Sequence, residues 1–362
     1  MKNKTILFDN FYNGKIVLIT GHSGFQGSWL SIWLRMLGAK VIGYGLEPYT
    51  NKDNFVVSGL KNKIINIIGD LRDYDLLSET INQCQPEIVF HLGAQSLVLE
   101  SYESPKETYD VNVGGTVNLF EACRLSGSVE TIINVTSDKC YQNNEWIWPY
   151  REIDPLGGFD PYSSSKGCSE IITNAYLQSF VSGSNSSTSL KGIASARAGN
   201  VIGGGDWHRN NLIASCIIAL ENKLPIQLRN PNAVRPWQHV LDAIFGYINL
   251  GYKISKNPTK YSGAWNFGPN TNLVSSVNKV VSKLLECWGE ENWEIYSSDL
   301  PQHEANLLQI ESTKAKIELD WEPIWDMDMM LQMTVDWYKN YKEPDIYKFC
   351  EKQIKSFQND LS

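Results

Sequence analysis

The sequence lacks the features that several classes of protein require. None of its apolar runs approaches the roughly 18 residues that a membrane-spanning helix needs. The opening segment, MKNKTILFDNFYNGK, lacks the apolar core that a signal peptide requires. The seven cysteines contain no CxxC pair and the five histidines are dispersed, so neither a disulfide framework nor a metal site is predicted. The formal net charge is −8 without a basic stripe, which excludes nucleic acid as an expected partner. We therefore expect a protein of the reducing cytoplasm.

The first half of the chain alternates short β-branched runs with longer helical patterns. Strands are predicted at KIVLIT (15–20), KVIGYGL (40–46), IINIIGD (64–70), EIVFHLGA (87–94), TIINVTS (131–137) and GIASARAGNVIG (192–203). Helical patterns lie between them, near 27–37, 73–83, 106–126 and 162–181. This alternation, with strands that are almost continuously apolar, predicts an α/β fold with a doubly wound parallel sheet.

The second half of the chain is less regular. Helical patterns near 210–222, 239–251, 273–288 and 328–341 are mixed with loops that carry proline and tryptophan. These segments predict a smaller, mixed lobe over the carboxyl edge of the sheet. At 42% hydrophobic and 20% charged residues, the 362-residue chain has the composition of a globular protein with a substantial core.

Three glycines, Gly21, Gly24 and Gly27, lie between the first strand and the first helix. In such a turn the first glycine permits a sharp bend and the second lets the backbone approach a pyrophosphate. The third lets the helix pack against the strand, with its amino end facing the anion. The turn therefore predicts a dinucleotide site, whereas the same spacing alone would also suit an ordinary glycine-rich turn.

The other cofactor contacts are expected where the third and fourth strands end. We predict that the cofactor is bound by Gly21, Gly24, Phe25, Gln26, Gly27, Asp70, Leu71, Leu92, Gly93 and Ala94. An acidic residue for the adenosine ribose is not evident, since Glu47 lies slightly beyond the end of the second strand. The choice between NAD and NADP stays open, and NAD is favoured because no arginine stands there for a 2′-phosphate.

Tyr162 and Lys166, in DPYSSSKG, are four residues apart and would share one face of a helix. A nearby ammonium, helped by the positive nicotinamide ring of a bound cofactor, favours the phenolate of a tyrosine, and lowering its pKa by roughly three units would take about 4 kcal/mol. Ser137, at the end of the preceding strand, could bond a substrate hydroxyl. Alone the YxxxK pattern is common on protein surfaces, but its order after the glycine turn and the serine indicates a reducing or oxidising site.

Five strings, GHSGFQG, DLRD, HLGAQS, TSDK and YSSSK, together resemble the extended short-chain dehydrogenase/reductase family. Longer strings, TSDKCY, DPLGGFDPYSSSKGCSE, RAGNVIGGGDW and RPWQHV among them, resemble its CDP-glucose 4,6-dehydratases over about residues 12–340. The resemblance implies a Rossmann-type domain at 1–197, receiving a segment near 233–265, and a nucleotide-sugar lobe mainly at 198–350.

The resemblance also implies a reaction and the residues that carry it. Tyr162 would take the proton of the sugar 4-hydroxyl while C4 gives hydride to NAD, which Tyr162 and Lys166 also help to bind. Asp138 would protonate the departing 6-hydroxyl, and hydride would return to C6. The net change is a dehydration of CDP-D-glucose to CDP-4-dehydro-6-deoxy-D-glucose.

Lys139 departs from the related TDP-glucose dehydratases, in which a glutamate removes the C5 proton. An ammonium cannot accept a proton, so Lys139 would have to be neutral at that step or hold the enolate while another group is the base. The ordinary alternative is an exposed Asp138–Lys139 pair at a strand end.

The same resemblance implies substrate contacts at Asn200 and Arg235, and Gln95, Ser137 and Arg209 are further predicted substrate contacts. For Arg209 the alternative is an ordinary solvated surface arginine. Arg235 would clamp phosphate, which suits its planar fork. A homodimer built from the helices near 106–126 and 162–181 is implied as well. The base of the nucleotide cannot be derived from spacing. An epimerase or reductase acting on another nucleotide sugar remains an alternative, as does a non-catalytic NAD-sensing scaffold.

Overall fold

The computed structural model describes residues 7–182, 188–228, 230–269, 274–290, 294–297 and 307–361. Its main sheet has seven strands in these residues, and every pairing between them is parallel. From one edge to the other they are β10 (Gly263–Phe267), β6 (Gly192–Ala198), β5 (Thr131–Val135), β4 (Ile88–His91), β1 (Ile16–Thr20), β2 (Lys40–Gly45) and β3 (Ile65–Ile68). The strand order reverses between β1 and β4, where ligands bind in open α/β sheets. The predicted doubly wound sheet is confirmed.

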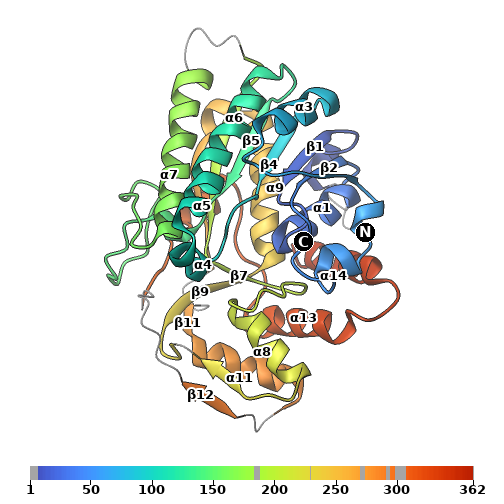
Figure 1. The fold of residues 1–362 in the computed structure, drawn as a ribbon, viewed down its shortest axis with the longest axis vertical. Helices are drawn as coiled ribbons and strands as arrows, with labels where there is room; N and C mark the ends of the chain where they lie inside the picture. The colour runs from blue at the N-terminus through green and yellow to red at the C-terminus, as the bar shows by residue number, and fades with distance from the viewer. Residues whose placement is uncertain are drawn as a thin grey trace.

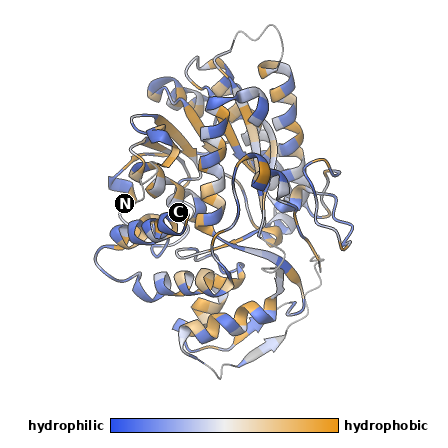
Figure 2. Cartoon of the chain, turned by 180° about the vertical axis from the view of Figure 1, so that it is seen from behind, coloured by the Kyte–Doolittle hydropathy of each residue, from blue (hydrophilic) through white to orange (hydrophobic). Residues whose placement is uncertain are grey.

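Helices cover both faces of this sheet (Figure 1). One face carries α1 (Phe25–Met36), α9 (Val240–Lys256) and α14 (Ile346–Asp360), and the other carries α3 (Tyr74–Cys84), α6 (Gly115–Leu125) and α7 (Pro161–Tyr176). Alternate residues of a strand therefore enter different cores: Val17 packs with the first set and Leu18 with the second. Figure 2 shows the apolar strands lying between these helices.

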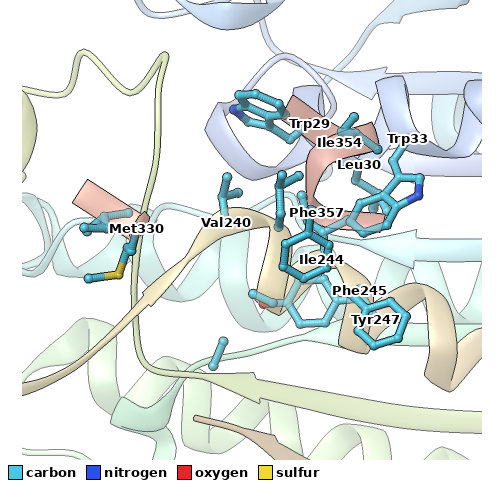
Figure 3. Close-up of a cluster of buried hydrophobic side chains, with 14 of the residues drawn as sticks. Trp29, Leu30, Trp33, Val240, Ile244, Phe245, Tyr247, Met330, Ile354 and Phe357 are labelled. Atoms are coloured by element: carbon cyan, nitrogen blue, oxygen red, sulfur yellow. The ribbon is translucent and has the colours of Figure 1, made fainter. Parts of the chain in front are cut away.

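The core under α1 is rich in aromatic side chains (Figure 3). Trp33 stacks near Phe245 of α9, with ring centroids 6.3 Å apart, and Phe357 of α14 meets Trp33 edge-on at 5.6 Å. The helical pattern analysis did not predict α14, whose mean hydropathy is low because its outer face is charged. Burial of Ile354 and Phe357 against α1 and α9 stabilises it instead.

The smaller lobe contains two further sheets in the described residues. The first is β11 (Val274–Ser276), β9 (Val234–His239) and β7 (Asn200–Ile202), and the second pairs β12 (Ile295–Ser297) with β8 (Ile226–Leu228). Its longer helices are α8 (Leu212–Glu221), α11 (Val277–Trp288) and α13 (Met327–Asn340). The domain division at 197/198 stays a prediction. In the segment near 233–265, β9 belongs to the smaller lobe, whereas α9 covers one face of the main sheet and β10 is its edge strand.

Short elements complete the described chain. They are α2 (Asn54–Val57), α4 (Val98–Glu103), α5 (Pro105–Tyr109), α10 (Pro258–Tyr261), α12 (Thr313–Glu318), the 3-10 turns η1 (Leu7–Asn10), η2 (Leu60–Asn62) and η4 (Asp138–Cys140), and the π-helical turns η3 (Asp110–Gly114) and η5 (Leu177–Val181). None of the helices in the described ranges is both long enough and apolar enough to span a membrane.

One predicted strand, 192–203, is wrong in its length. The structure divides it at Gly199 into β6, in the main sheet, and β7, in the small one. A Cβ at Gly199 would lie 2.8 Å from Cγ of Pro236, so the chain turns away from the main sheet where only glycine fits against β9. This break carries Asn200 across the carboxyl edge of the main sheet.

Candidate active site

A cavity of about 540 Å³ lies over the carboxyl ends of β1, β4 and β5. The smaller lobe forms its other wall with residues of β7 and of the loop before α8. All ten predicted cofactor residues of the turn and the two strand ends line this cavity, together with Ser137, Asp138, Lys139, Tyr162, Lys166 and Asn200. The fold thus brings most of the predicted site residues together.

The glycine turn between β1 and α1 has the backbone that a phosphate site requires. Gly21 has φ +71°, and a Cβ there would lie 2.7 Å from the backbone nitrogen of Gly93. A Cβ at Gly27 would lie 2.2 Å from the carbonyl oxygen of Gly21, so the start of α1 packs directly on the turn. At Gly24, which precedes the first residue of α1, a Cβ would touch only that same carbonyl, at 3.4 Å.

The amino end of α1 therefore opens to the cavity. The first amide groups of a helix have no partners within it, and the helix dipole favours an anion there. Gly24, Phe25, Gln26 and Gly27 all line the cavity at this point. These residues fit a dinucleotide pyrophosphate, because the turn leaves room at Gly24 and directs amides toward it.

The ends of β3 and β4 supply the next part of the wall. Leu71 packs so closely that a Cβ at Gly93 would lie 2.9 Å from its Cδ1. Asp70 is paired with Arg72, whose Nη2 lies 2.6 Å from its Oδ2, and this guanidinium lowers the pKa of Asp70. Gln95 is not in the cavity lining, since its side chain folds back onto the backbone of Leu97. A substrate contact at Gln95 stays a prediction.

Helix α7 begins after Asp160, which caps its amino end, and its first residue is a proline. The side chain of Asp160 accepts hydrogen bonds from the backbone nitrogen of Ser163 at 2.9 Å and from its hydroxyl at 2.6 Å. Pro161 takes the first helical position, where its missing N–H costs nothing. Tyr162 and Lys166 consequently lie one turn apart on the side of α7 that faces the cavity.

Burial controls the acid–base properties of this pair. It raises the pKa of Tyr162 above its usual value of 10, and the Ser137 hydroxyl opposes this only in part. The Lys166 Nζ lies 6.0 Å from the centroid of the Tyr162 ring. Burial also lowers the pKa of Lys166 to about 8, against the charge of Glu170. Because burial is the largest cause of the raised value, the lowering of the pKa of Tyr162 by Lys166 together with a positive nicotinamide stays a prediction for the NAD-bound protein.

Asp138 lies in an environment that disfavours its charged form. It is 1% exposed, and its Oδ2 has no hydrogen-bond partner in the described structure, while Oδ1 accepts from the Ser137 hydroxyl at 3.0 Å. Burial raises the pKa of Asp138, although the nearby charge of Lys139 opposes the shift. A neutral carboxyl with a free oxygen at the cavity wall can donate a proton. The exposed strand-end pair considered above is therefore excluded for Asp138.

The remaining predicted substrate residues take different positions. Asn200 begins β7 and lines the cavity. Arg235 is buried in β9, where its charge opposes the raised pKa of Asp138, but it is not in the cavity lining. Arg209 is exposed in the loop before α8 and also lies outside the lining. Phosphate contacts at Arg209 and Arg235 stay predictions.

A buried amide next to the site was not predicted from the sequence. Asn112 lies in the π-helical turn η3, which interrupts the single helix predicted over 106–126. Its side chain accepts from the nitrogen of Gln95 at 2.8 Å and donates to the hydroxyl of Ser165 at 2.8 Å. Asn112 thus joins the end of β4 to α7. Single π-turns are frequent at functional sites, but no residue pattern in the sequence signals one.

Two loops also meet over the cavity mouth. Tyr49, which follows β2, stacks on His208 of the smaller lobe, with ring centroids 3.9 Å apart and planes inclined by 16°. Both residues line the cavity, as do Glu47 and Asp53. Sequence reasoning could not pair Tyr49 with His208, because the contact forms only when the lobe folds onto the sheet.

Comparisons with known proteins agree with this geometry. A family model described as GDP-mannose 4,6 dehydratase matches residues 18–334. The CDP-glucose 4,6-dehydratase of Salmonella typhimurium is 43% identical over 345 residues, which cover 95% of this chain and 96% of that protein.

Solved structures with lower identity share the fold. A UDP-glucose 4-epimerase from Thermotoga maritima, solved with UDP-glucose, has a TM-score of 0.77 at 21% identity and covers 91% of this chain and 100% of its own. A dTDP-glucose 4,6-dehydratase from Bacillus anthracis, in complex with NAD, has a TM-score of 0.73 at 23% identity and covers 91% of this chain and 98% of its own.

Proposed function

Because the chain belongs to the GDP-mannose 4,6 dehydratase family, within the extended short-chain dehydrogenases/reductases, we propose that it catalyses NAD-dependent dehydration of CDP-D-glucose. The product would be CDP-4-dehydro-6-deoxy-D-glucose, formed with the release of one water. The 43% identity to a CDP-glucose 4,6-dehydratase over nearly its whole length supports the choice of substrate. The observation that carries the choice of reaction is Asp138, a buried carboxyl with an unpartnered oxygen beside Ser137 and Tyr162.

The cavity fits NAD, with the pyrophosphate at the amino end of α1 and the strand-end residues along its length. When bound, NAD supplies a reversible acceptor for the hydride of C4, which is returned to C6. Its positive charge also favours the phenolate, which the protein's own groups do not achieve. The proposed roles of the chain's residues follow from this.

Tyr162 takes the proton of the 4-hydroxyl as the 4-ketone forms, with Ser137 bonded to the same hydroxyl. The ketone acidifies the hydrogen on C5, so that the 6-hydroxyl can leave. Asp138 gives its proton to the departing 6-hydroxyl, which leaves as water. Lys139 lies at the same wall and either accepts the C5 proton as a neutral amine or holds the enolate. A proton returns to C5 once C6 has been reduced. The chain regains its starting state when Tyr162 releases the proton of the 4-hydroxyl to solvent and Asp138 takes one up, so that protons balance over the cycle.

Substrate selection tests this proposal directly. The purified protein, supplied with NAD, is incubated with CDP-, TDP-, GDP- and UDP-glucose in parallel. We expect the alkali-induced ultraviolet chromophore of a 4-keto sugar with CDP-glucose, at a kcat/KM at least about 100-fold above the others, because a site that hydrogen-bonds one base rejects its analogues strongly. A C4 epimer formed without loss of water would favour the epimerase alternative, and an absence of chromophore with NAD bound would refute dehydration.

We also propose that the protein acts as a cytoplasmic homodimer in deoxysugar biosynthesis for surface polysaccharides such as the lipopolysaccharide O-antigen. Helices α5, α6 and α7 lie side by side (Figure 1) and expose apolar side chains, including Leu125 and Ile171, each 59% exposed. Pairing these helices with a second copy would bury that surface.

Sedimentation velocity tests the dimer. We expect the mass of two chains for the wild type and of one chain for Ile171→Glu, because a buried unpaired charge opposes association. Ile317→Glu, on α12 and 72% exposed, is the matched control and should remain a dimer. If Ile171→Glu had the mass of two chains, as Ile317→Glu is expected to have, the interface would lie elsewhere.

A further inference from the structure

Glu170 is a buried carboxylate that the chemistry above does not use. It lies one helical turn after Lys166 on α7, and its side chain is 2% exposed. It accepts hydrogen bonds from the hydroxyls of Thr136 and Ser195, the latter at 2.7 Å. It also forms an ion pair with Arg197, at 2.7 Å from Nη2 to Oε2. Replacing a buried pair by apolar residues is often neutral for stability, so its presence calls for another explanation.

Arg197 extends this contact to a second point. Its Nη1 donates to the hydroxyl of Tyr141 at 2.8 Å and to the carbonyl oxygen of Glu152 at 3.2 Å. The Tyr141 hydroxyl in turn donates to the side-chain oxygen of Asn266 at 2.7 Å. Arg197 is 3% exposed, so these partners hold it without competition from solvent.

Thr136 and Tyr141 are the two residues that bracket the catalytic turn. Thr136 immediately precedes Ser137, and Tyr141 follows the 3-10 turn η4 (Asp138–Cys140). The buried ion pair therefore contacts both ends of the segment that carries Ser137, Asp138 and Lys139: Glu170 at one end and Arg197 at the other. Its Glu170 member is part of the same helix as Tyr162 and Lys166.

We propose that Glu170 and Arg197 are positioning residues, which fix the 136–141 segment against α7 and so set the spacing between Asp138 and Tyr162. This inference rests on the proposed function, since it concerns the same reaction. The alignment matters because a displacement of about 1 Å at a reacting group can cost about 100-fold in rate.

The charge of Glu170 has a second consequence for Lys166. The titratable groups around Lys166 are His91 from β4, Cys140 from η4, and Tyr162 and Glu170 from its own helix. Burial lowers the pKa of His91 and raises that of Cys140, so both are neutral. The carboxylate of Glu170 thus opposes the loss of the Lys166 proton.

Two variants that each remove one hydroxyl donor to Glu170 test the positioning. Thr136→Val removes the bond at the catalytic turn, and Ser195→Ala removes an equivalent bond from β6, away from the reacting groups. We expect Thr136→Val to lower kcat for CDP-glucose by about 10- to 100-fold with KM within about 3-fold. Ser195→Ala should stay within about 3-fold of the wild type in both constants. Equal kcat values for the two variants would overturn the inference.

A pH profile separates charge from shape at Glu170. In Glu170→Gln the ammonium of Lys166 loses its counter-charge. The contribution of Lys166 to the fall of kcat/KM at high pH should therefore move down by about one pH unit, whereas the contribution of Asp138 should stay in place. Glu170→Asp keeps the charge and should keep the wild-type position of this fall, even with a lower rate. This role would be contradicted if the fall of kcat/KM at high pH kept its position in Glu170→Gln, or if it moved by the same amount in Glu170→Asp.

Thermal melting is recorded for each variant, because Glu170→Gln leaves Arg197 buried without its partner and can fail to fold. In that case the comparison of Thr136→Val with Ser195→Ala decides the question alone. A wild type that forms no 4-keto sugar would refute the proposed function instead, an outcome distinct from every variant result.

Discussion

Replacement of Tyr162 by phenylalanine is expected to lower kcat for the dehydration of CDP-glucose by about 10³- to 10⁴-fold. The change removes one oxygen from a buried side chain at the cavity wall, so the fold and the cavity should be retained. Without the phenolate, no group at the α7 wall takes the proton of the 4-hydroxyl, and oxidation at C4 cannot begin. Steady-state formation of the 4-keto chromophore measures the loss.

NAD affinity is measured in the same variant by titration, and we expect it to stay within about 3-fold of the wild type, because the pyrophosphate contacts of α1 are untouched. Tyr109→Phe is the matched control. Tyr109 also bonds a residue of α7, the hydroxyl of Ser164 at 3.1 Å, but it lies outside the cavity lining. If Tyr162→Phe retained more than a tenth of the wild-type kcat, another group would have to be the base.

Asp138→Asn should separate oxidation from loss of water. The amide keeps the shape of the carboxyl but has no acidic proton to give to the 6-hydroxyl. We expect product formation to fall by about 10²- to 10³-fold, the usual contribution of a positioned acid. Because Tyr162 is intact, C4 should still be oxidised, so reduced cofactor accumulates and is seen by its near-ultraviolet absorbance in a single turnover.

The pH dependence of the wild type should agree with this role. Since burial raises the pKa of Asp138, its proton persists to a higher pH than that of an ordinary carboxyl, and the rate of water loss falls only as the pH rises through that raised pKa. Asp154→Asn, at a carboxyl that pairs with the exposed Arg151 and lies outside the cavity lining, serves as the control and should leave all rates unchanged. Product formation at the wild-type rate by Asp138→Asn would exclude it as the acid.

The elements that the sequence predicted well share one property: their signals are local. The strand–glycine–helix turn at Gly21, the four-residue spacing of Tyr162 and Lys166, and the apolar runs of the sheet each depend on neighbouring residues. Backbone periodicity then places Tyr162 and Lys166 on one helical face. The strand predicted over 192–203 failed at Gly199 because its break results from contact with Pro236, which lies far along the chain.

Helix α14 and the turn η3 were not predicted because neither has a clear local signal in the sequence. A charged outer face conceals the apolar residues with which α14 packs on α1, and a π-turn needs no special residue type. The side chain of Gln95 bonds to the backbone of Leu97, a contact that its motif does not signal, and its predicted substrate contact stays a prediction.

By itself, the sequence determined the class of fold and the dinucleotide turn, because these follow from composition and short spacings, and it predicted the groups for proton transfer. The tertiary structure alone decided which of those groups are desolvated and which distant ones meet. Burial raises the pKa of Asp138 and the pKa of Tyr162. Burial also shields from solvent the ion pair of Glu170 and Arg197, which contacts both ends of the catalytic turn. Burial is a property of packed segments, and no single segment of the chain contains it.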